Sequence, residues 1–219
     1  MYVHPTYTIP EAAEYLAIDS WTLHSWYAEE ILKPSGWYGN GTFALLSFRD
    51  VEEAYKIHLL RTKFHYSMQY LRKALPKARQ RSRSQHPLIT HNFVVFKELC
   101  IEMPGRRKQE RHVEALGPVA KPLLIPQVTD AWGKRIVSTA KGRNQIFPWR
   151  YAERDEISRP VSLDPEVMSG RLVVTGTRIP VVILRNRKSK GESPLSIADD
   201  YGIDEDIVQK ALEHIGKAA

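Results

Sequence analysis

The residues that most often carry enzyme chemistry are scattered along this chain rather than grouped. Its eight histidines do not recur beside carboxylates at the spacing of a metal-ligand set. The acidic runs Asp199–Asp200 and Asp204–Asp206 fit exposed positions at helix ends. The run Val173–Thr177 is too short for a phosphate-binding loop and lacks the lysine of one. The sequence therefore predicts that the protein is not an enzyme and needs no metal or cofactor.

Positive charge is concentrated in one part of the chain. The formal net charge is +7, and residues 1–152 carry 22 basic against 13 acidic side chains. No acidic residue occurs between Glu53 and Glu98. The basic residues of that interval are Lys56, Arg61, Lys63, Arg72, Lys73, Lys77, Arg79, Arg81, Arg83 and Lys97. Exposed charged faces usually mix both signs, so this run favours a polyanionic partner, although 79–84 alone also fits a flexible linker.

The composition sets the compartment and the broad class. Cys100 is the only cysteine, which excludes a disulfide framework and a cysteine-based zinc cluster. The sequence shows no secretory signal and no apolar stretch long enough to span a bilayer. With 219 residues, 42% of them hydrophobic, the chain suits one or two domains with real cores. We therefore expect a soluble cytoplasmic protein that does not bind membranes.

Two short helices are predicted at the N-terminus. Thr8 is a good cap for a helix whose first turn holds Pro10 and Glu11. Residues 17–19 leave room only for a turn, and Ser20 is the expected cap of the second helix. The side chains that would point outward from this second helix, towards a DNA major groove, are Trp21, Thr22, His24 and Ser25. An ordinary helical hairpin is the alternative.

The segment that follows strengthens the DNA-binding interpretation. Residues 37–43 predict a β-hairpin with a glycine-flanked turn, and Ser47 or Asp50 begins a third helix. This order resembles the winged helix-turn-helix domain of MerR-type DNA-binding proteins over roughly residues 6–64. The resemblance implies that the wing at Asn40 lies on the DNA backbone or in the minor groove. The residues expected to contact phosphates are Lys33, Tyr38 and Arg49.

The central part of the chain gives weaker signals. A helix is predicted at 67–75, where Pro76 either kinks it or lets it resume over 77–82. Residues 87–103 predict β structure, 104–111 a mobile polar loop and 123–138 a helix that includes Ile136. Residues 147–151 form an aromatic connector suited to packing, and 154–160 a linker. The expected domains are therefore 1–84, 85–152 and 153–219.

Three short helices are predicted near the C-terminus. The first starts at Pro180, with Ile179, Val182, Ile183 and Asn186 expected on its inward face. The run Gly191–Leu195 caps the second, Gly202 ends it, and the third occupies 203–212. The outline is that of a second helix-turn-helix, but phosphates would repel the acidic start of its last helix. We therefore expect a protein-contact or dimerisation module, and an α+β fold for the chain as a whole.

The C-terminal segment is similar to the small tri-helical domain of antitoxins that are paired with PIN-domain ribonucleases. The similarity rests on Asp164-Pro-Glu-Val167 and on the run Gly170–Val181, followed by Gly191-Glu-Ser193 and Asp200-Tyr-Gly-Ile203. With the winged head in front, the whole chain resembles a VapB-type antitoxin of two domains. This implies a homodimeric autorepressor that binds duplex operator DNA and neutralises a PIN-domain toxin. The alternative is a stand-alone MerR-type transcriptional regulator whose C-terminal part dimerises or binds an effector.

The toxin-binding surface implied by this resemblance is open between two basic regions. PIN nucleases depend on clustered carboxylates and a divalent metal, which basic side chains of an antitoxin can cover. The candidates near the first C-terminal helix are Arg178, Arg185, Arg187 and Lys188, together with Lys190. An equal alternative is the middle loop, with Arg106, Arg107 and Lys108.

Overall fold

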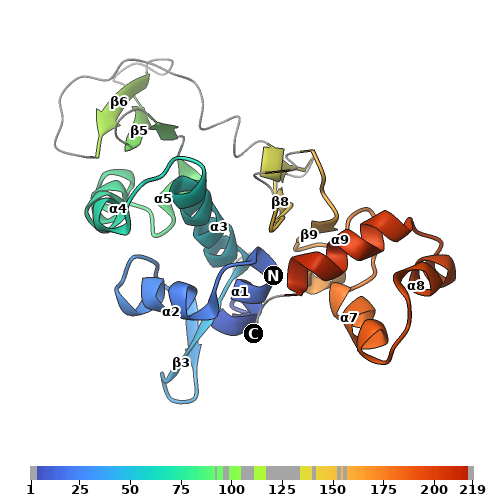
Figure 1. The fold of residues 1–219 in the computed structure, drawn as a ribbon. Helices are drawn as coiled ribbons and strands as arrows, with labels where there is room; N and C mark the ends of the chain where they lie inside the picture. The colour runs from blue at the N-terminus through green and yellow to red at the C-terminus, as the bar shows by residue number, and fades with distance from the viewer. Residues whose placement is uncertain are drawn as a thin grey trace.

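The computed structural model describes residues 4–91, 93–95, 99–104, 111–116, 134–139, 142–151, 154 and 157–216. It is a mixed α+β structure in which short antiparallel sheets accompany the helices. Figure 1 shows the N-terminal helices and hairpin on one side, the C-terminal helices on the other, and strand β8 between them. Within the described residues, no helix is both long and apolar enough to cross a membrane.

The two N-terminal helices form as the sequence predicts. Helix α1 spans Ile9–Leu16, and the Thr8 hydroxyl accepts a hydrogen bond from the Glu11 amide at 3.3 Å. Helix α2 spans Ser20–Ala28, but its cap is Asp19, whose carboxylate accepts from the Thr22 amide at 2.8 Å. The expectation that Ser20 is the cap was wrong by one residue. A carboxylate at a helix start also interacts favourably with the positive end of the helix dipole, which favours Asp19 over Ser20 as the cap.

The hairpin and third helix are also confirmed. Strands β2 (Gly36–Tyr38) and β3 (Phe43–Leu46) pair, and β3 also pairs with the short N-terminal strand β1 (Tyr7–Thr8). Helix α3 spans Phe48–Thr62 and starts with a capping box. In it, the Ser47 hydroxyl accepts from the Asp50 amide, while the Asp50 carboxylate accepts from the Ser47 amide at 2.6 Å. Ser47 is therefore the cap, and Asp50 completes the capping box from the first turn of the helix.

The central part agrees with expectation in one place and differs in two. Helix α4 spans Met68–Ser82 and so continues past Pro76, which was one of the two expected alternatives, whereas α5 (Pro87–Thr90) is helical where a strand was expected. Strands β4 (Phe93–Val95), β5 (Leu99–Pro104) and β6 (Arg111–Ala115) form an antiparallel sheet. Ile136, assigned to a helix from its spacing, lies in strand β7 (Ile136–Ser138) and pairs with Ile146 of β8 (Asn144–Ile146). The rest of the expected loop and helix falls largely outside the described residues.

The C-terminal unit combines a two-stranded sheet with three helices. Strands β9 (Val161–Ser162) and β10 (Val173–Val174) are antiparallel, with a short 3-10 turn at Met168–Gly170 between them. The helices are α7 (Val181–Ser189), α8 (Pro194–Tyr201) and α9 (Glu205–Ile215). The predicted boundaries of α8 are confirmed, because Ser193 caps its start and Gly202 ends it in the left-handed conformation.

The inward face of α7 was predicted incorrectly. Val181 and Leu184 are buried, whereas Val182 and Ile183 are 40% and 39% exposed. Helix α7 packs against both α8 and α9, and these contacts select the face that contains Val181 and Leu184. The sequence period alone could not select this face, because apolar residues occur at four successive positions, 181–184.

Candidate nucleic-acid interface and its junction with the C-terminal unit

Helix α2 has one buried face and one accessible face. Leu23, Trp26 and Tyr27 are buried, so the helix is held by apolar contacts. Trp21 on the opposite face is 77% exposed, and His24 is exposed as well. Thr22 and Ser25 are half-buried, and the Ser25 hydroxyl donates to the Thr22 carbonyl at 2.7 Å. All four predicted base-facing residues therefore retain some access to solvent, with Trp21 the most exposed.

The β2–β3 hairpin extends beyond the body of the molecule beside α2 (Figure 1). The rings of Tyr38 and Phe43 stack at 4.9 Å across the two strands, and both side chains are exposed. The hairpin tip consists of Gly39, Asn40 and Gly41, all with positive φ. Glycine adopts this conformation without strain and asparagine tolerates it well, which accounts for the tight turn. Asn40 is consequently exposed in the turn of the hairpin.

Basic side chains are absent from the two elements just described. Neither the α2 segment 20–28 nor the hairpin segment 36–46 contains a lysine or arginine. Lys33, between them, is exposed. Arg49 at the start of α3 is half-buried, and its charge lies close enough to His86 to affect the pKa of that histidine. The surface is thus aromatic and polar, and positive charge for a polyanion must come largely from neighbouring elements.

The acid-free stretch supplies only part of its charge to the surface. Lys56 is buried in an ion pair with Glu52 at 2.9 Å, and it donates to the Leu88 carbonyl at 2.9 Å. Arg72, Arg79 and Arg81 bind respectively Glu29, the carbonyls of residues 30 and 31, and Glu114. These four side chains therefore have structural partners. Within this stretch, the exposed basic residues that have no partner among the described residues are Arg61, Lys73, Lys77 and Arg83.

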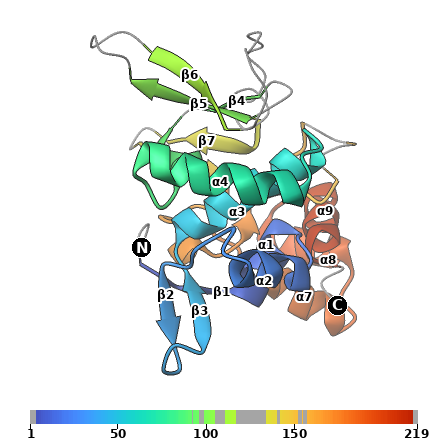
Figure 2. The same cartoon turned by 90° about the vertical axis from the view of Figure 1, so that its left-hand side faces the viewer.

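Helix α4, which carries Lys73 and Lys77, lies on the same side of the molecule as α2 and the hairpin. Figure 2 shows α4 crossing above α2, with the hairpin extending below it. The Arg72–Glu29 pair fixes α4 to the end of α2, with 2.9 Å between Arg72 Nε and the carboxylate. Positive charge on α4 can therefore act beside the aromatic face of α2 and the hairpin.

His86, Asp50 and Glu53 form a polar cluster at the start of α3. His86 Nδ1 is 3.1 Å from the Glu53 carboxylate, and its other ring nitrogen is 3.8 Å from Asp50. Burial opposes the charged form of His86. The hydrogen bond to Glu53 and the two carboxylate charges nevertheless raise the net pKa of His86 above its ordinary value. The cluster ties α5 to α3 by charge as well as by packing.

The opposite side of the N-terminal unit is joined to the C-terminal unit by polar contacts. The Tyr7 hydroxyl donates to the Gly170 carbonyl at 3.0 Å, and His214 Nε2 lies 2.8 Å from the Tyr15 carbonyl. Arg185 of α7 forms an ion pair with Glu14 of α1. These contacts join residues more than 150 positions apart in sequence. They fix α1, rather than α2, to the C-terminal unit.

His214 is the most buried polar residue of this junction. Its Nδ1 accepts the Arg150 amide at 3.3 Å, so the proton of the neutral ring is placed on Nε2, where it reaches Tyr15. Trp149 stacks on the ring at 6.2 Å. Burial lowers the pKa of His214 to about 4, and the positive charge of Arg150 acts in the same direction. The histidine is therefore neutral in the folded protein near neutral pH.

The candidate toxin-binding residues divide into two pairs. Arg185 is engaged with Glu14, and Arg187 binds both Glu192 and Asp200 while its guanidinium lies over the Tyr201 ring. These carboxylates raise the pKa of Arg187 above its ordinary value. Arg178 and Lys188 are exposed and have no ion pair within the described part of the chain. The alternative residues Arg106, Arg107 and Lys108 lie outside the described residues.

Sequence reasoning did not identify the junction residues. The connector 147–151 was expected to pack, and Phe147 and Trp149 are indeed buried, but Arg150 has a polar role that was not foreseen. His214 follows Ala211 by three positions on the apolar face of α9, which is the one signal that marked it as a core histidine. Nothing in the sequence connects Tyr7 with Gly170.

Comparisons with known proteins support the fold. Residues 161–214 match the family described as "Protein of unknown function (DUF433)", a region that includes all three C-terminal helices except the last residue of α9. The crystal structure of Rv2018 from Mycobacterium tuberculosis is similar over 95% of this chain and 97% of its own, with 21% identity and a TM-score of 0.59. Comparison with curated proteins gives no match. The chain thus shares its overall arrangement with that crystal structure, and its C-terminal unit resembles a recurrent family.

Proposed function

We propose that the chain binds duplex DNA through α2 and the β2–β3 hairpin, as a winged helix-turn-helix of MerR type. The observation that carries this proposal is the accessible face of α2, where Trp21 and His24 protrude beside a projecting hairpin. An α-helix of this kind fits the major groove, and a hairpin beside it reaches the backbone or the minor groove. Thr22 and Ser25 complete the face that would contact base edges.

Phosphate binding is assigned to residues around this face. Lys33 and the exposed lysines of α4 supply charge, while Tyr38 and Asn40 contact the backbone from the hairpin. Arg49, also expected to contact phosphate, is half-buried and would need to extend outward. A homodimer would read two half-sites of a palindromic operator, since a two-fold protein matches a two-fold site.

We further propose that the protein is an antitoxin that represses its own operon and inhibits a PIN-domain ribonuclease. Support comes from the tri-helical C-terminal unit, which leaves Arg178 and Lys188 exposed and without partners among the described residues. An arginine can bind a carboxylate-lined nuclease site bidentately. Arg185 and Arg187 would have to exchange their internal carboxylates for those of the toxin. Arg178 and Lys188 are therefore the stronger candidates.

The DNA-binding proposal is tested with a double variant, Thr22→Glu and Ser25→Glu. Two carboxylates on this face should repel phosphates and abolish operator binding in a gel-shift assay. Ser196→Glu, at an exposed position in the first turn of α8, is the matched control and should bind as the natural chain does. Unfolding curves of all three proteins establish that the fold is retained. Unchanged affinity of the double variant would refute the proposed DNA-binding surface.

The antitoxin proposal requires a nuclease assay. The chain is co-purified with the product of the neighbouring reading frame, and ribonuclease activity is measured with and without it. We expect Arg178→Ala to weaken inhibition without changing DNA affinity or the midpoint of thermal unfolding. If Arg178 only braces the turn at Gly176 and Thr177, both inhibition and unfolding temperature should fall. Failure of the natural chain to inhibit the nuclease would refute the antitoxin role.

A stand-alone MerR-type regulator is the second candidate, and one observation favours it. Arg185 and Arg187 are both neutralised within the chain, and Arg185 uses its charge to hold the C-terminal unit against α1. An effector domain would be expected to make such a contact with a DNA-binding head. In that case the chain binds its operator, and the neighbouring reading frame encodes no nuclease that it inhibits.

A further inference from the structure

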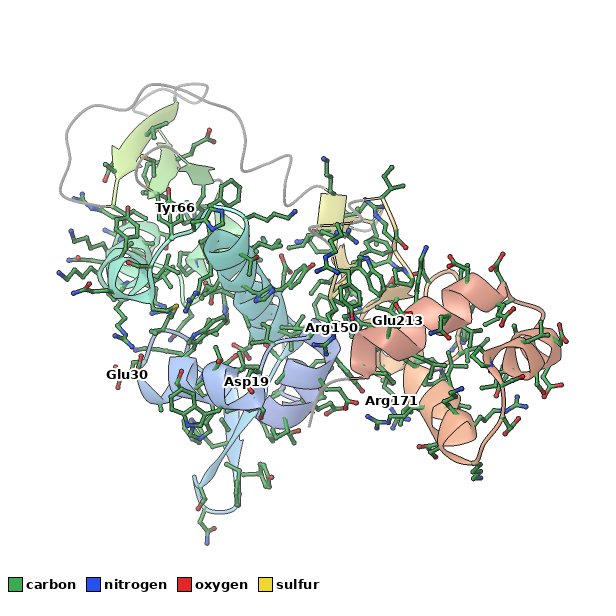
Figure 3. All side chains as sticks on the ribbon, viewed as in Figure 1. Asp19, Glu30, Tyr66, Arg150, Arg171 and Glu213 are labelled. Carbon is green, nitrogen blue, oxygen red and sulfur yellow. The ribbon has the colours of Figure 1, made fainter. Side chains whose placement is uncertain are left out.

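A groove of about 510 Å³ lies where the turn between α1 and α2 faces the C-terminal unit. Ala13, Ala17 and Ile18 contribute small apolar surface to it, and Arg150 and Arg185 reach it from the other side. Arg150 and Asp19, which both line the groove, are labelled in Figure 3. Its volume is within the range of sites that bind small molecules, and such sites are frequent where domains meet.

Arg150 is held in place by contacts that leave its terminal nitrogens available. Its Nε donates to the His214 carbonyl at 3.0 Å, and its backbone amide donates to the His214 ring. No partner of the two terminal nitrogens is found among the described residues. A guanidinium fixed in this way is already arranged to bind a carboxylate, because little side-chain entropy is lost on binding.

The remaining charges of the groove restrict what can bind there. Asp19, Glu11 and Glu14 line the same space as the two arginines. One oxygen of Asp19 caps α2, and the other has no partner among the described residues. Three carboxylates so close to the arginines disfavour a phosphate or another dianion. They favour a ligand that carries a positive group beside its carboxylate.

We propose that this groove binds a small zwitterion, a free α-amino acid or a short peptide with both charged termini. The ligand's carboxylate binds the terminal nitrogens of Arg150, and its ammonium group binds Asp19. Ala13 and Ala17 leave room for a small side chain. The groove includes the start of α2 but none of Trp21, Thr22, His24 and Ser25, so its existence does not depend on the proposed DNA binding.

Three matched probes test the charge requirement. Isothermal titration calorimetry of the full chain is carried out near neutral pH with the dipeptide Ala-Ala, its N-acetyl derivative and its C-terminal amide. Ala-Ala should bind, and each derivative, having lost one charged terminus, should bind about tenfold more weakly or not at all. Equal binding of all three compounds, or no binding of Ala-Ala at millimolar concentration, would overturn the proposal.

Two variants assign the contacts to residues. Asp19→Asn keeps the helix cap, because asparagine also caps well, but removes the charge that meets the ammonium group. Arg150→Lys keeps the positive charge but not the forked geometry. Both should weaken Ala-Ala binding about tenfold. The control is Asp204→Asn, at the exposed cap of α9, which should leave binding unchanged.

A DNA phosphate is the competing occupant of the same groove. If Arg150→Lys lowers DNA affinity while Ala-Ala fails to bind the natural chain, the groove belongs to the DNA-binding surface and the zwitterion site is refuted. If Ala-Ala binding is lost in Asp19→Asn and Arg150→Lys but retained in Asp204→Asn, the site is supported. Thermal unfolding of each variant identifies any that lose binding through loss of the fold.

Discussion

The two N-terminal helices meet very different surroundings. Helix α1 is joined to the C-terminal unit through the Tyr15 carbonyl and Glu14, and the strand just before it is joined through Tyr7. Helix α2 has an accessible face on which Trp21 is 77% exposed. Just beyond its end, Arg72 and Arg79 of α4 bind Glu29 and the carbonyls of residues 30 and 31. One helix of the pair thus contacts the C-terminal unit, and the other has a face that is exposed to solvent.

Under the proposed function, this difference separates residues that stabilise the fold from residues that would contact DNA. Changes on the α1 side should lower the free energy of unfolding, because they leave buried polar groups unpaired or create overlap. Changes on the α2 side should alter binding and have little effect on unfolding, as is usual for exposed positions. The predictions below test this separation, beginning with the contact at Gly170.

Gly170→Ala should have the largest effect. The added methyl group would overlap the Tyr7 hydroxyl, and Gly170 already has a φ of +78° that alanine adopts with strain. Overlap and strain together should lower the free energy of unfolding by about 4 kcal/mol. Gly176→Ala is the matched control, because Gly176 has the same φ of +78° with open space around it. That control should lose only about 1 kcal/mol, measured by urea denaturation.

Removing the Tyr7 hydroxyl distinguishes overlap from strain. Tyr7→Phe alone should lower the free energy of unfolding by about 1 kcal/mol, because the Gly170 carbonyl loses its hydrogen bond. In the double variant with Gly170→Ala, the total loss should be smaller than the sum of the two single losses, since the clashing atom is gone. Simple additivity would show that Tyr7 and Gly170 do not interact in solution.

The second prediction concerns acid. Burial gives His214 a folded-state pKa of about 4, below its ordinary value of 6.5. The folded state disfavours protonation of His214, so the unfolded state takes up this proton first as pH falls. The stability linked to neutral His214 is therefore complete above pH 6.5 and is lost as pH falls through 4. The loss should reach about 3 kcal/mol. Urea denaturation at a series of pH values from 7 to 4 measures it.

A variant without the titrating group provides the control. His214→Gln has an amide that can donate to the Tyr15 carbonyl but does not titrate, so its stability should fall less between pH 6.5 and 4. His86 should act in the opposite direction, because its pKa is raised. Its contribution is present below 6.5 and declines as pH rises through the folded-state value. Parallel curves for His214→Gln and the natural chain would exclude His214 as the source of the acid effect.

Local signals explain what was predictable from sequence. Thr8 identifies the start of α1, and Ser47 together with Asp50 indicates that of α3. The two glycines around Asn40 identify the hairpin turn, because each of these residues acts on neighbouring backbone. The bounds of α8 follow from Ser193 and Gly202 for the same reason. Asp19 displaced Ser20 as the cap of α2, since two suitable residues stood side by side.

Non-local contacts explain what was missed. Ile136 lies in a strand because it pairs with Ile146, ten positions later in the sequence. Helical spacing of apolar residues cannot reveal that pairing. The inward face of α7 depends on α9, and a run of apolar residues fits more than one face. At the candidate site, the outward positions of α2 follow from helix geometry. Arg150 lines the groove while its Nε donates to the His214 carbonyl, and sequence gives no sign of this contact between residues 64 positions apart.

The hairpin aromatics provide the third prediction. The double variant Tyr38→Ser and Phe43→Ser removes a stacked pair of rings. Both side chains are exposed, so the free energy of unfolding should change by about 1 kcal/mol or less. DNA affinity should fall by about tenfold if the hairpin contacts the duplex. Gel shifts and urea curves on the same preparation compare the two effects. If the free energy of unfolding falls substantially while DNA affinity is unchanged, the two aromatic side chains stabilise the fold and do not contact DNA.

The smallest expected effect concerns salt. Lys73 and Lys77 on α4 are exposed and have no partners among the described residues. Replacing both with glutamine should make the plot of log affinity against log salt less steep by about 2, because each phosphate that is no longer bound reduces the steepness by about 0.9. Arg81→Gln is the control, because Arg81 is paired with Glu114 at 3.2 Å and has less charge to offer a phosphate. Fluorescence anisotropy with labelled duplex DNA at several salt concentrations gives both slopes. If the lysine variant keeps the slope of the natural chain, α4 lies outside the DNA-binding surface, and the charge-poor face of α2 and the hairpin must bind DNA with little help from α4.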